Sequence, residues 1–340
     1  MSEWLIYRGT RDPHDEIAEL PSPPPWRVFD ESAPPVSPPT ETSDAEVRKA
    51  VAYRPDHDTV ERVNAAIYLR RPLLVSGAPG TGKSSLAYSI AHELKLGRVL
   101  RWPITSRAVL RDGLYEYDPL ARLYAASRRP EGAFPPGQDE AGDEDIGRYI
   151  RLGPLGTALL PSLRPRVLLI DEIDKGDLDL PNDLLTVFEE GTFEIRELVR
   201  LAETRQEVKV LPFDSQTRIP VTMGRIRCRA FPIVVMTSNA EREFPPAFLR
   251  RCIQVTLRDP DRDKLIEIVT AHLAGASASS MELIDQFLES KGRGVLATDQ
   301  LLNAIYLTDS AQRRGDIDRR ALAEHVMSRL SSSRLSPDDD

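Results

Sequence analysis

Residues 77–84 read GAPGTGKS, a pattern that can surround the phosphate groups of a nucleotide. Its glycines let backbone N–H groups converge on phosphate oxygens, and the helix predicted to begin near Lys83 points its positive end at the same place. Lys83 would contact the β- and γ-phosphates, and the Ser84 hydroxyl would bind Mg²⁺. The predicted phosphate-binding residues are Gly77, Ala78, Pro79, Gly80, Thr81, Gly82, Lys83, Ser84 and Ser85.

Two adjacent acids follow the apolar run at residues 167–170. The run predicts a strand, and α/β sheets bind their ligands at the carboxyl ends of strands. Asp171 is therefore expected to hold Mg²⁺ through water, and Glu172 to orient and deprotonate an attacking water molecule. This pairing favours hydrolysis over transfer to another acceptor. The chain has no N-K-x-D pattern of the kind that selects guanine, which favours ATP as the nucleotide.

The bulk composition is that of an acidic chain with enough apolar residues for a sizeable core. The chain has 340 residues, a net charge of −8 and 41% hydrophobic residues. The acidic balance argues against a broad nucleic-acid-binding surface. Only Cys228 and Cys252 could form a disulfide, and no apolar run approaches the roughly 18 residues that span a membrane. We therefore expect a soluble, cytoplasmic protein without disulfides or a membrane segment.

The elements that must position these residues are strands alternating with helices. Apolar runs typical of strands lie at 72–76, 98–104, 166–170, 232–238 and 253–257, with helical patterns between most of them. Such alternation predicts a mostly parallel sheet between two helical layers, a three-layer α/β fold.

Other segments flank or interrupt this core. A proline-rich N-terminal segment is expected to form a flexible arm, because proline disfavours both helices and sheet ladders. Residues 105–150 and 191–231 are expected to be insertions, the first with an acidic loop and the second with hairpins. A purely helical segment after Pro260 predicts a small second domain, a lid. The predicted boundaries are 1–45 for the arm, 46–257 for the core, 258–331 for the lid and 332–340 for a disordered tail.

In their order, these motifs resemble those of the AAA+ ATPases, and within them the MoxR-like branch. The resemblance covers about residues 46–330: GAPGTGKS, then LGPLGTALL ahead of LLIDEIDK, a hairpin-like insertion before VVMTSN, FPPAFLRRC, and a helical lid. It implies a P-loop NTPase core with a five-stranded parallel sheet of order 5-1-4-3-2. It also implies ATP and Mg²⁺ as ligands and a homo-oligomeric, hexameric ring.

The resemblance assigns roles to further residues. Asn239 matches sensor 1, the polar residue that positions the attacking water together with Glu172. Arg250 and Arg251 match the arginine finger, which reaches the γ-phosphate held by a neighbouring subunit. The branch often has Leu-Asp-Arg-Phe here, which favours Arg251 but leaves the choice open. Tyr53, ahead of the phosphate loop, is a candidate for lining the adenine pocket.

One part of the resemblance is missing. Many AAA+ lids carry a sensor 2 arginine near the start of a lid helix, where this chain has Thr298, Asp299 and Gln300. We therefore expect that sensor 2 is absent or replaced.

The leading hypothesis is a MoxR-like, chaperone-like ATPase that hydrolyses ATP at ring interfaces to remodel or activate a partner protein, often one with a von Willebrand A domain. Two alternatives stay open. One is an NTP-driven nucleic-acid motor of a restriction or defence system, which the alternating Arg225, Arg227 and Arg229 favour and the net charge opposes. The other is an ATP-gated scaffold without turnover, which the adjacent Asp171 and Glu172 oppose. Neither nucleic acid nor a membrane is expected as a partner.

Overall fold

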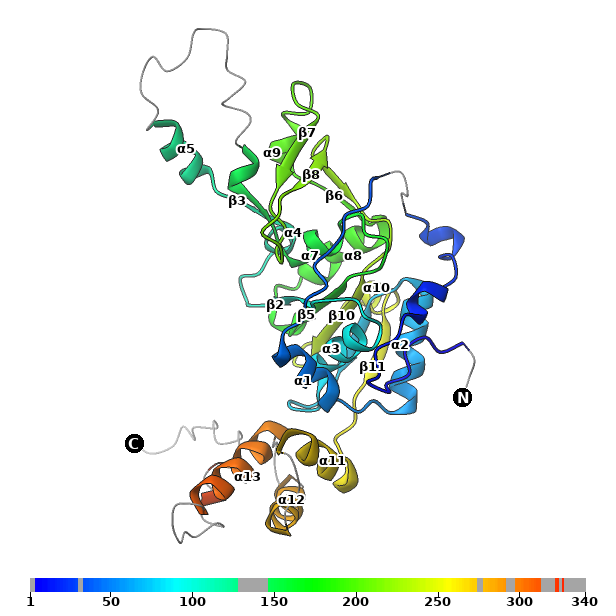
Figure 1. Cartoon of the computed structure of the whole chain (residues 1–340), viewed down its shortest axis with the longest axis vertical. Coiled ribbons are helices and arrows are strands. Elements are labelled where there is room, and N and C mark those ends of the chain that lie inside the picture. The colour runs from blue at the N-terminus through cyan, green and yellow to red at the C-terminus, as the bar shows by residue number, and fades with distance from the viewer. Residues whose placement is uncertain are drawn as a thin grey trace, which may run out of the picture.

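A computed structural model describes residues 4–29, 33–127, 146–273, 278–291, 297–312, 322–323 and 326. Figure 1 shows a central sheet with helices on both faces. A group of helices lies at the C-terminal end of the molecule, and a hairpin-rich unit lies at the opposite end. The predicted tail at 332–340 and the acidic run at 130–145 lie outside the described residues.

The central sheet has five strands, all parallel, in the order β11-β1-β10-β5-β2. Counted along the chain within this sheet, that order is 5-1-4-3-2, so the predicted topology is confirmed. Because the strands are parallel, their carboxyl ends meet at one edge of the sheet. The strands are β1 (Leu73–Ser76), β2 (Leu100–Pro103), β5 (Val167–Asp171), β10 (Ile233–Ser238) and β11 (Ile253–Thr256).

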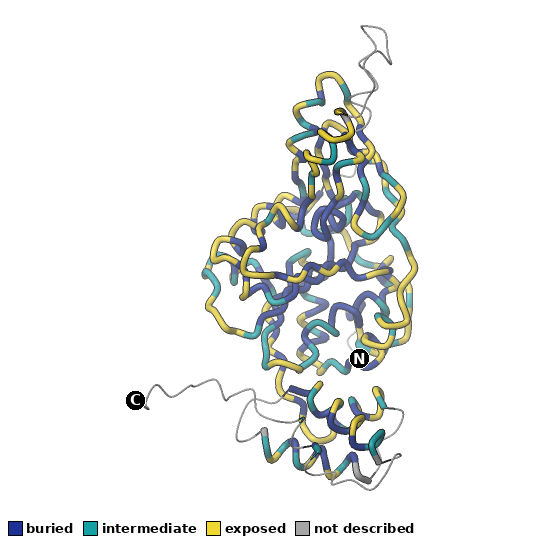
Figure 2. Tube along the Cα trace, turned by 90° about the vertical axis from the view of Figure 1, so that its left-hand side faces the viewer, coloured by how far each residue is buried: buried dark blue, intermediate teal, exposed yellow. Residues whose placement is uncertain are grey.

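Both faces of this sheet are buried, which explains why its inner strands are continuously apolar in sequence. Successive side chains point to opposite faces, so Leu168 and Leu169 belong to two different hydrophobic clusters. Figure 2 shows the resulting buried centre. One face is covered by α1 (Asp44–Ala52), α2 (His57–Leu69) and α3 (Lys83–Glu93), and the other by α7 (Pro154–Ala158) and α8 (Leu180–Glu190).

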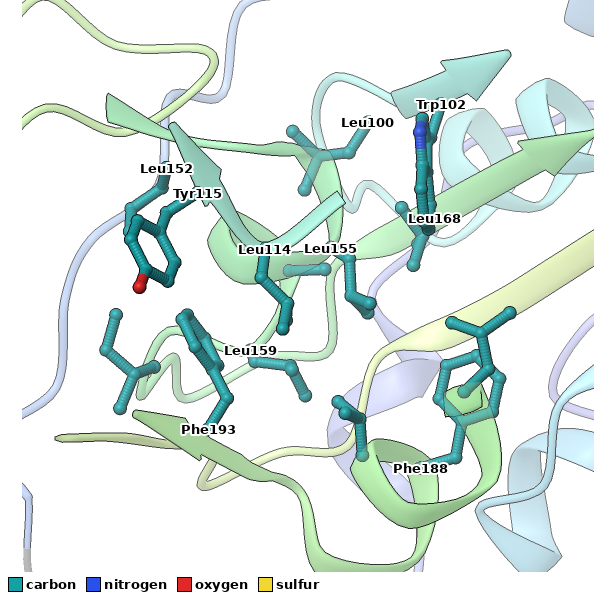
Figure 3. Packing of buried hydrophobic residues seen from close by; sticks show 14 of the residues in the cluster. Leu100, Trp102, Leu114, Tyr115, Leu152, Leu155, Leu159, Leu168, Phe188 and Phe193 are labelled. Carbon is teal, nitrogen blue, oxygen red and sulfur yellow. The ribbon is translucent and has the colours of Figure 1, made fainter. Parts of the chain in front are cut away.

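The two predicted insertions extend the hydrophobic cluster on the α7 and α8 side of the sheet, the cluster that contains Leu168. Figure 3 shows Tyr115, Leu152 and Phe193 of the insertions packed with Leu155 and Leu159 beside the sheet. The first insertion contains α4 (Leu110–Leu114), β3 (Tyr115–Tyr117), α5 (Pro119–Ser127) and η3 (Ile146–Tyr149), and it ends with β4 (Ile150–Leu152), which extends two residues beyond the predicted end at 150. The second contains β6 (Thr192–Glu194), α9 (Arg196–Val199), β7 (Glu207–Val210), β8 (Ile219–Thr222) and β9 (Arg225–Arg227), whose strands form an antiparallel sheet.

The C-terminal helices pack around a separate core. Leu265, Ile284, Phe287 and Leu301 are almost fully buried there, and no residue of the central sheet belongs to this cluster. The described part of the predicted lid is therefore helical. Its helices are α11 (Arg262–Leu273), α12 (Ala278–Lys291) and α13 (Thr298–Gln312), and short elements elsewhere are η1 (Glu16–Glu19), η2 (Pro25–Arg27), η4 (Ile173–Lys175) and α10 (Pro246–Leu249).

The prediction of a flexible arm at 1–45 is wrong for much of its described part, which packs on the core. Tyr7 is fully buried, and the backbone N–H groups of Ile6 and Tyr7 donate to Oδ1 of Asn64 at 2.7 and 3.0 Å. The buried carboxylate of Glu93 accepts the N–H group of Gly9 at 3.1 Å. Proline prevents ladder pairing, but buried side chains of α2 and α3 satisfy the backbone groups instead.

Within the described residues, no helix combines the length and the apolar character that crossing a bilayer requires.

Asn64→Leu is expected to detach the N-terminal segment. The amide of Asn64 also donates to the carbonyl oxygens of Tyr7 and Val60, so leucine would leave buried polar groups unpaired. We expect a loss of about 2–4 kcal/mol in the free energy of unfolding, measured by denaturant titration. Limited proteolysis should then cleave the segment before residue 29. Glu61→Gln on the same helix is the control and should change neither readout, and an unchanged Asn64→Leu variant would refute the anchoring role.

Candidate active site

The predicted phosphate loop connects β1 to α3 and closes on the side chain of Lys83. The ammonium group of Lys83 donates to the carbonyl oxygens of Gly77 and Ala78 at 2.8 and 2.9 Å. The Thr81 hydroxyl donates to the Ala78 carbonyl at 2.9 Å. Burial lowers the pKa of Lys83, while the nearby carboxylates, with Asp174 the strongest, act in the opposite direction. The loop is therefore preformed around a cation.

Two glycines let other elements approach this loop closely. Gly80 has φ +79°, and a Cβ there would lie 2.5 Å from the backbone nitrogen of Thr298. Gly82 has φ +87°, and a Cβ there would lie 3.2 Å from the ring of Tyr53. Both φ values favour glycine. The loop thus lies between the end of α1 and the first residue of α13, which brings the lid to the site.

The carboxylate of Asp171 connects several elements at the sheet edge. Its Oδ1 accepts hydrogen bonds from the hydroxyls of Ser84 and Thr237, both at 2.7 Å. Its Oδ2 accepts from Nη2 and Nε of Arg101 at 2.7 and 3.1 Å. Burial acts to raise the pKa of Asp171, but these hydrogen bonds outweigh it and lower the pKa below its ordinary value. Asp171 is therefore held ionised.

Glu172 follows in a left-handed backbone conformation, with φ +62°. This conformation is costly for a residue with a side chain, and it turns the chain sharply after the strand. Its N–H group donates to the Thr237 hydroxyl at 2.9 Å, which fixes the turn. Its carboxylate forms a 2.8 Å ion pair with Lys175, and both side chains are 43% exposed. Glu172 thus reaches the solvent side of the site.

Asp174 links the end of β5 to the turn that carries Asn239. Its side chain is buried, and its Oδ2 accepts the N–H groups of Asn239 and Glu241 at 2.9 and 3.2 Å. Ala240 between them has φ +59°, so the turn is tight. The amide of Asn239 donates to the carboxylate of Glu241 at 3.3 Å. Asp174 therefore positions the backbone of the predicted sensor 1 residue.

A pocket of about 450 Å³ lies over the phosphate loop. It brings together most of the predicted site residues, while Gly77 and Ala78 lie behind it as acceptors for Lys83. The predicted residues that line it are Tyr53, Pro79, Gly80, Thr81, Gly82, Lys83, Ser84, Ser85, Asp171, Glu172 and Asn239. Further lining residues include Arg101, Arg258, Lys264, His272, Thr298 and Asp299.

Arg250 and Arg251 do not line this pocket; they follow α10. Arg250 is exposed, and its guanidinium makes no hydrogen bond or ion pair with the described residues. Arg251 is half-buried, pairs with the carboxylate of Glu189 on α8, and donates to the Ala247 carbonyl at 3.2 Å. Both arginines therefore lie outside the pocket of the chain that carries them.

The polar groups of the pocket fit Mg²⁺ bound together with a nucleotide. The Ser84 hydroxyl donates a hydrogen bond to Asp171, so its oxygen keeps lone pairs for a metal ion. Within the described residues, no group of three or more His, Cys, Asp or Glu side chains could hold a metal alone. Mg²⁺ sites in nucleotide-binding proteins typically use one or two carboxylates plus substrate phosphates, so Ser84 and Asp171 suffice.

Sequence reasoning assigned no role to Arg101, Asp174 or Thr237, whose hydrogen bonds order this site. Thr237 stands at the end of the apolar run 232–238, where a hydroxyl could have been noted. Arg101 alternates with the buried Leu100 and Trp102, so a side chain on the opposite face could be expected, but not its partner. The role of Asp174 could be seen only once β10 had been placed beside β5, because its partner Asn239 follows β10.

Comparison with known proteins agrees with this geometry. The AAA domain family (dynein-related subfamily) matches residues 72–252, from the residue before β1 to the residue before β11. No curated protein matches the chain. The match covers more than half of the chain and includes the phosphate loop, Asp171, Asn239 and the two arginines. This protein therefore belongs to the AAA domain family, in its dynein-related subfamily, and is an AAA+ ATPase.

Proposed function

We propose that this chain forms a ring in which ATP is hydrolysed between subunits, and that the ring remodels or activates a partner protein in the manner of MoxR-like ATPases. One observation carries the proposal. The pocket contains the groups that bind phosphate and activate water, whereas the only residues that match an arginine finger lie outside it. A site divided in this way is complete only when a second copy supplies an arginine.

The residues of one subunit perform the first part of the reaction. Lys83 and the loop N–H groups bind the phosphates, and Tyr53 packs behind the loop. Bound at Ser84 and Asp171, Mg²⁺ would neutralise charge on the β- and γ-phosphates. The carboxylate of Glu172 leaves its ion pair with Lys175 and accepts a proton from the attacking water. Asn239 orients that water.

Arg251 of the neighbouring subunit would stabilise the charge that develops on the γ-phosphate. We favour Arg251 over Arg250 because Glu189 and the Ala247 carbonyl already fix the direction of its guanidinium. A preorganised cation loses less side-chain entropy when it binds phosphate. In the ring, the phosphate would then compete with Glu189 for the same guanidinium.

A protein partner is supported by an apolar surface on α5, in the first insertion. Leu120, Leu123 and Tyr124 are 64%, 65% and 67% exposed, and their spacing places them on one side of the helix. Such grouped apolar exposure is typical of protein interaction sites. Figure 1 shows α5 at the end of the molecule opposite the lid. A von Willebrand A domain is the partner class that we propose, by resemblance.

The two alternative functions have less support. The arginine stripe that favoured a nucleic-acid motor is partly neutralised, since Arg225 forms a 2.9 Å ion pair with Glu194. Arg229 donates to the carbonyl oxygen of Ala33 within the chain. A scaffold without turnover would not need Glu172 beside the phosphate loop.

Mixing two inactive variants tests the divided site. Arg251→Ala should lower ATP turnover by about 10³-fold, because the transition-state charge loses its partner. Lys83→Ala should abolish turnover because the phosphates are not bound. A one-to-one mixture should regain activity, since roughly a quarter of the interfaces in a random ring combine an intact pocket with an intact arginine. Activity is measured by phosphate release.

The same mixture made with Arg250→Ala is the matched control for the choice of arginine. Arg250→Ala alone should retain most of the turnover. If Arg250→Ala is inactive and is rescued by Lys83→Ala, Arg250 is the finger. If neither mixture recovers, or if the nucleotide-bound protein is monomeric on a sizing column, the divided site is refuted.

A second test concerns the α5 surface. Leu123→Asp should weaken binding of a von Willebrand A domain partner by at least ten-fold, since a charge would enter the apolar contact. Basal ATP turnover should stay unchanged, because α5 is remote from the pocket. Binding is measured with Glu172→Gln protein held in ATP. Asp118→Asn, just before the helix, is the control, and equal binding by Leu123→Asp would refute the surface.

A further inference from the structure

Several cations that the divided-site scheme does not use line the pocket, and one of them, Arg101, contacts the carboxylate of Asp171. Arg101 lies on β2, at the edge of the sheet, and pairs in register with Leu169 of β5. Asp171 follows Leu169 by two residues, so the side chains of Arg101 and Asp171 lie on the same face of the sheet. The guanidinium reaches Oδ2 of Asp171 through both Nε and Nη2.

With Arg101 in place, the hydrogen-bonding capacity of Asp171 is filled. A carboxylate offers about four acceptor positions. Two are used by the hydroxyls of Ser84 and Thr237 on Oδ1, and two by Arg101 on Oδ2. A water molecule bound to a metal ion needs one of these positions to donate a hydrogen bond to Asp171. Because Ser84 and Thr237 belong to the preformed site, the oxygen that Arg101 holds is the one that can be freed.

The two partners of this ion pair differ in their freedom to move. The side chain of Asp171 is 9% exposed, whereas that of Arg101 is 53% exposed. Arg101 can therefore move from Asp171 to solvent or to a phosphate, because its own charge stays solvated. The nearly buried carboxylate of Asp171, which lies near the carboxylates of Glu172 and Asp174, then needs another cation in its place.

We propose that Arg101 is a positioning residue that occupies the magnesium side of the pocket, holds the carboxylate of Asp171 in place when the pocket is empty, and releases it when Mg²⁺ enters with the nucleotide. This inference rests on the proposed function of the pocket. It adds a competition between two cations for one carboxylate. The apparent affinity of the pocket for Mg²⁺ is then set partly by the strength of the Arg101–Asp171 pair.

The test measures binding rather than turnover. A fluorescent, non-hydrolysable ATP analogue is bound to the full chain, and Mg²⁺ is titrated at fixed nucleotide. We expect Arg101→Gln to lower the half-saturating Mg²⁺ concentration about three-fold or more, because the competing cation is removed. Arg101→Lys keeps the charge but loses the two-nitrogen contact, so it should lie between the wild type and Arg101→Gln.

Arg258→Gln is the matched control, since Arg258 lines the same pocket but makes no hydrogen bond to Asp171 in the described structure. It should leave the Mg²⁺ midpoint within two-fold of the wild type. An equal shift in Arg258→Gln would mean that pocket charge alone explains the effect, and would overturn the proposal. An unchanged or higher midpoint in Arg101→Gln would also overturn it.

The experiment separates this inference from the proposed function. If the wild type does not bind the nucleotide at any Mg²⁺ concentration, the function of the pocket is refuted. If it binds with the same Mg²⁺ midpoint in the wild type, Arg101→Gln and Arg101→Lys, only the role of Arg101 is refuted. Thermal unfolding without nucleotide checks that each variant is folded.

Discussion

The carboxylate of Asp171 connects four elements, and the geometry of the site depends on it. It accepts hydrogen bonds from Ser84 at the start of α3, Thr237 on β10 and Arg101 on β2, while it stands itself at the end of β5. A buried carboxylate is costly unless it is paired in this way. Satisfying it therefore fixes the phosphate loop and three strand ends relative to one another.

The charges around Asp171 follow from this arrangement. Asp171, Glu172 and Asp174 crowd three acids into four residues, which like-charge repulsion opposes. Within the chain each acid has an internal partner: Arg101 for Asp171, Lys175 for Glu172, and backbone N–H groups for Asp174. We therefore expect that a nucleotide and its metal ion bind in this site by exchanging for these internal partners.

The predictions from the sequence succeeded where a pattern is local. The strand order followed from the resemblance of motifs in sequence, and the parallel sheet confirms it. The prediction for the N-terminal segment was wrong because a high proline content indicates only that a segment does not form helices or sheet ladders. It does not indicate whether the segment packs on the surface of the core, as this one does on α2 and α3. The burial of Tyr7 depends on Asn64, 57 residues away, which no local pattern contains.

By itself, the sequence determined the phosphate loop, the acids after the third strand and the alternation of strands with helices. These features are set by residues adjacent in the chain, through backbone conformation and periodic burial. Only the tertiary structure decided that Arg101 meets Asp171 across 70 residues, that Asp174 holds the turn of Asn239, and that Arg251 pairs with Glu189 outside the pocket. The first two contacts depend on strand order and register, because the folded sheet brings the ends of β2, β5 and β10 together. The third depends on the packing of α8 beside α10, which no local pattern contains.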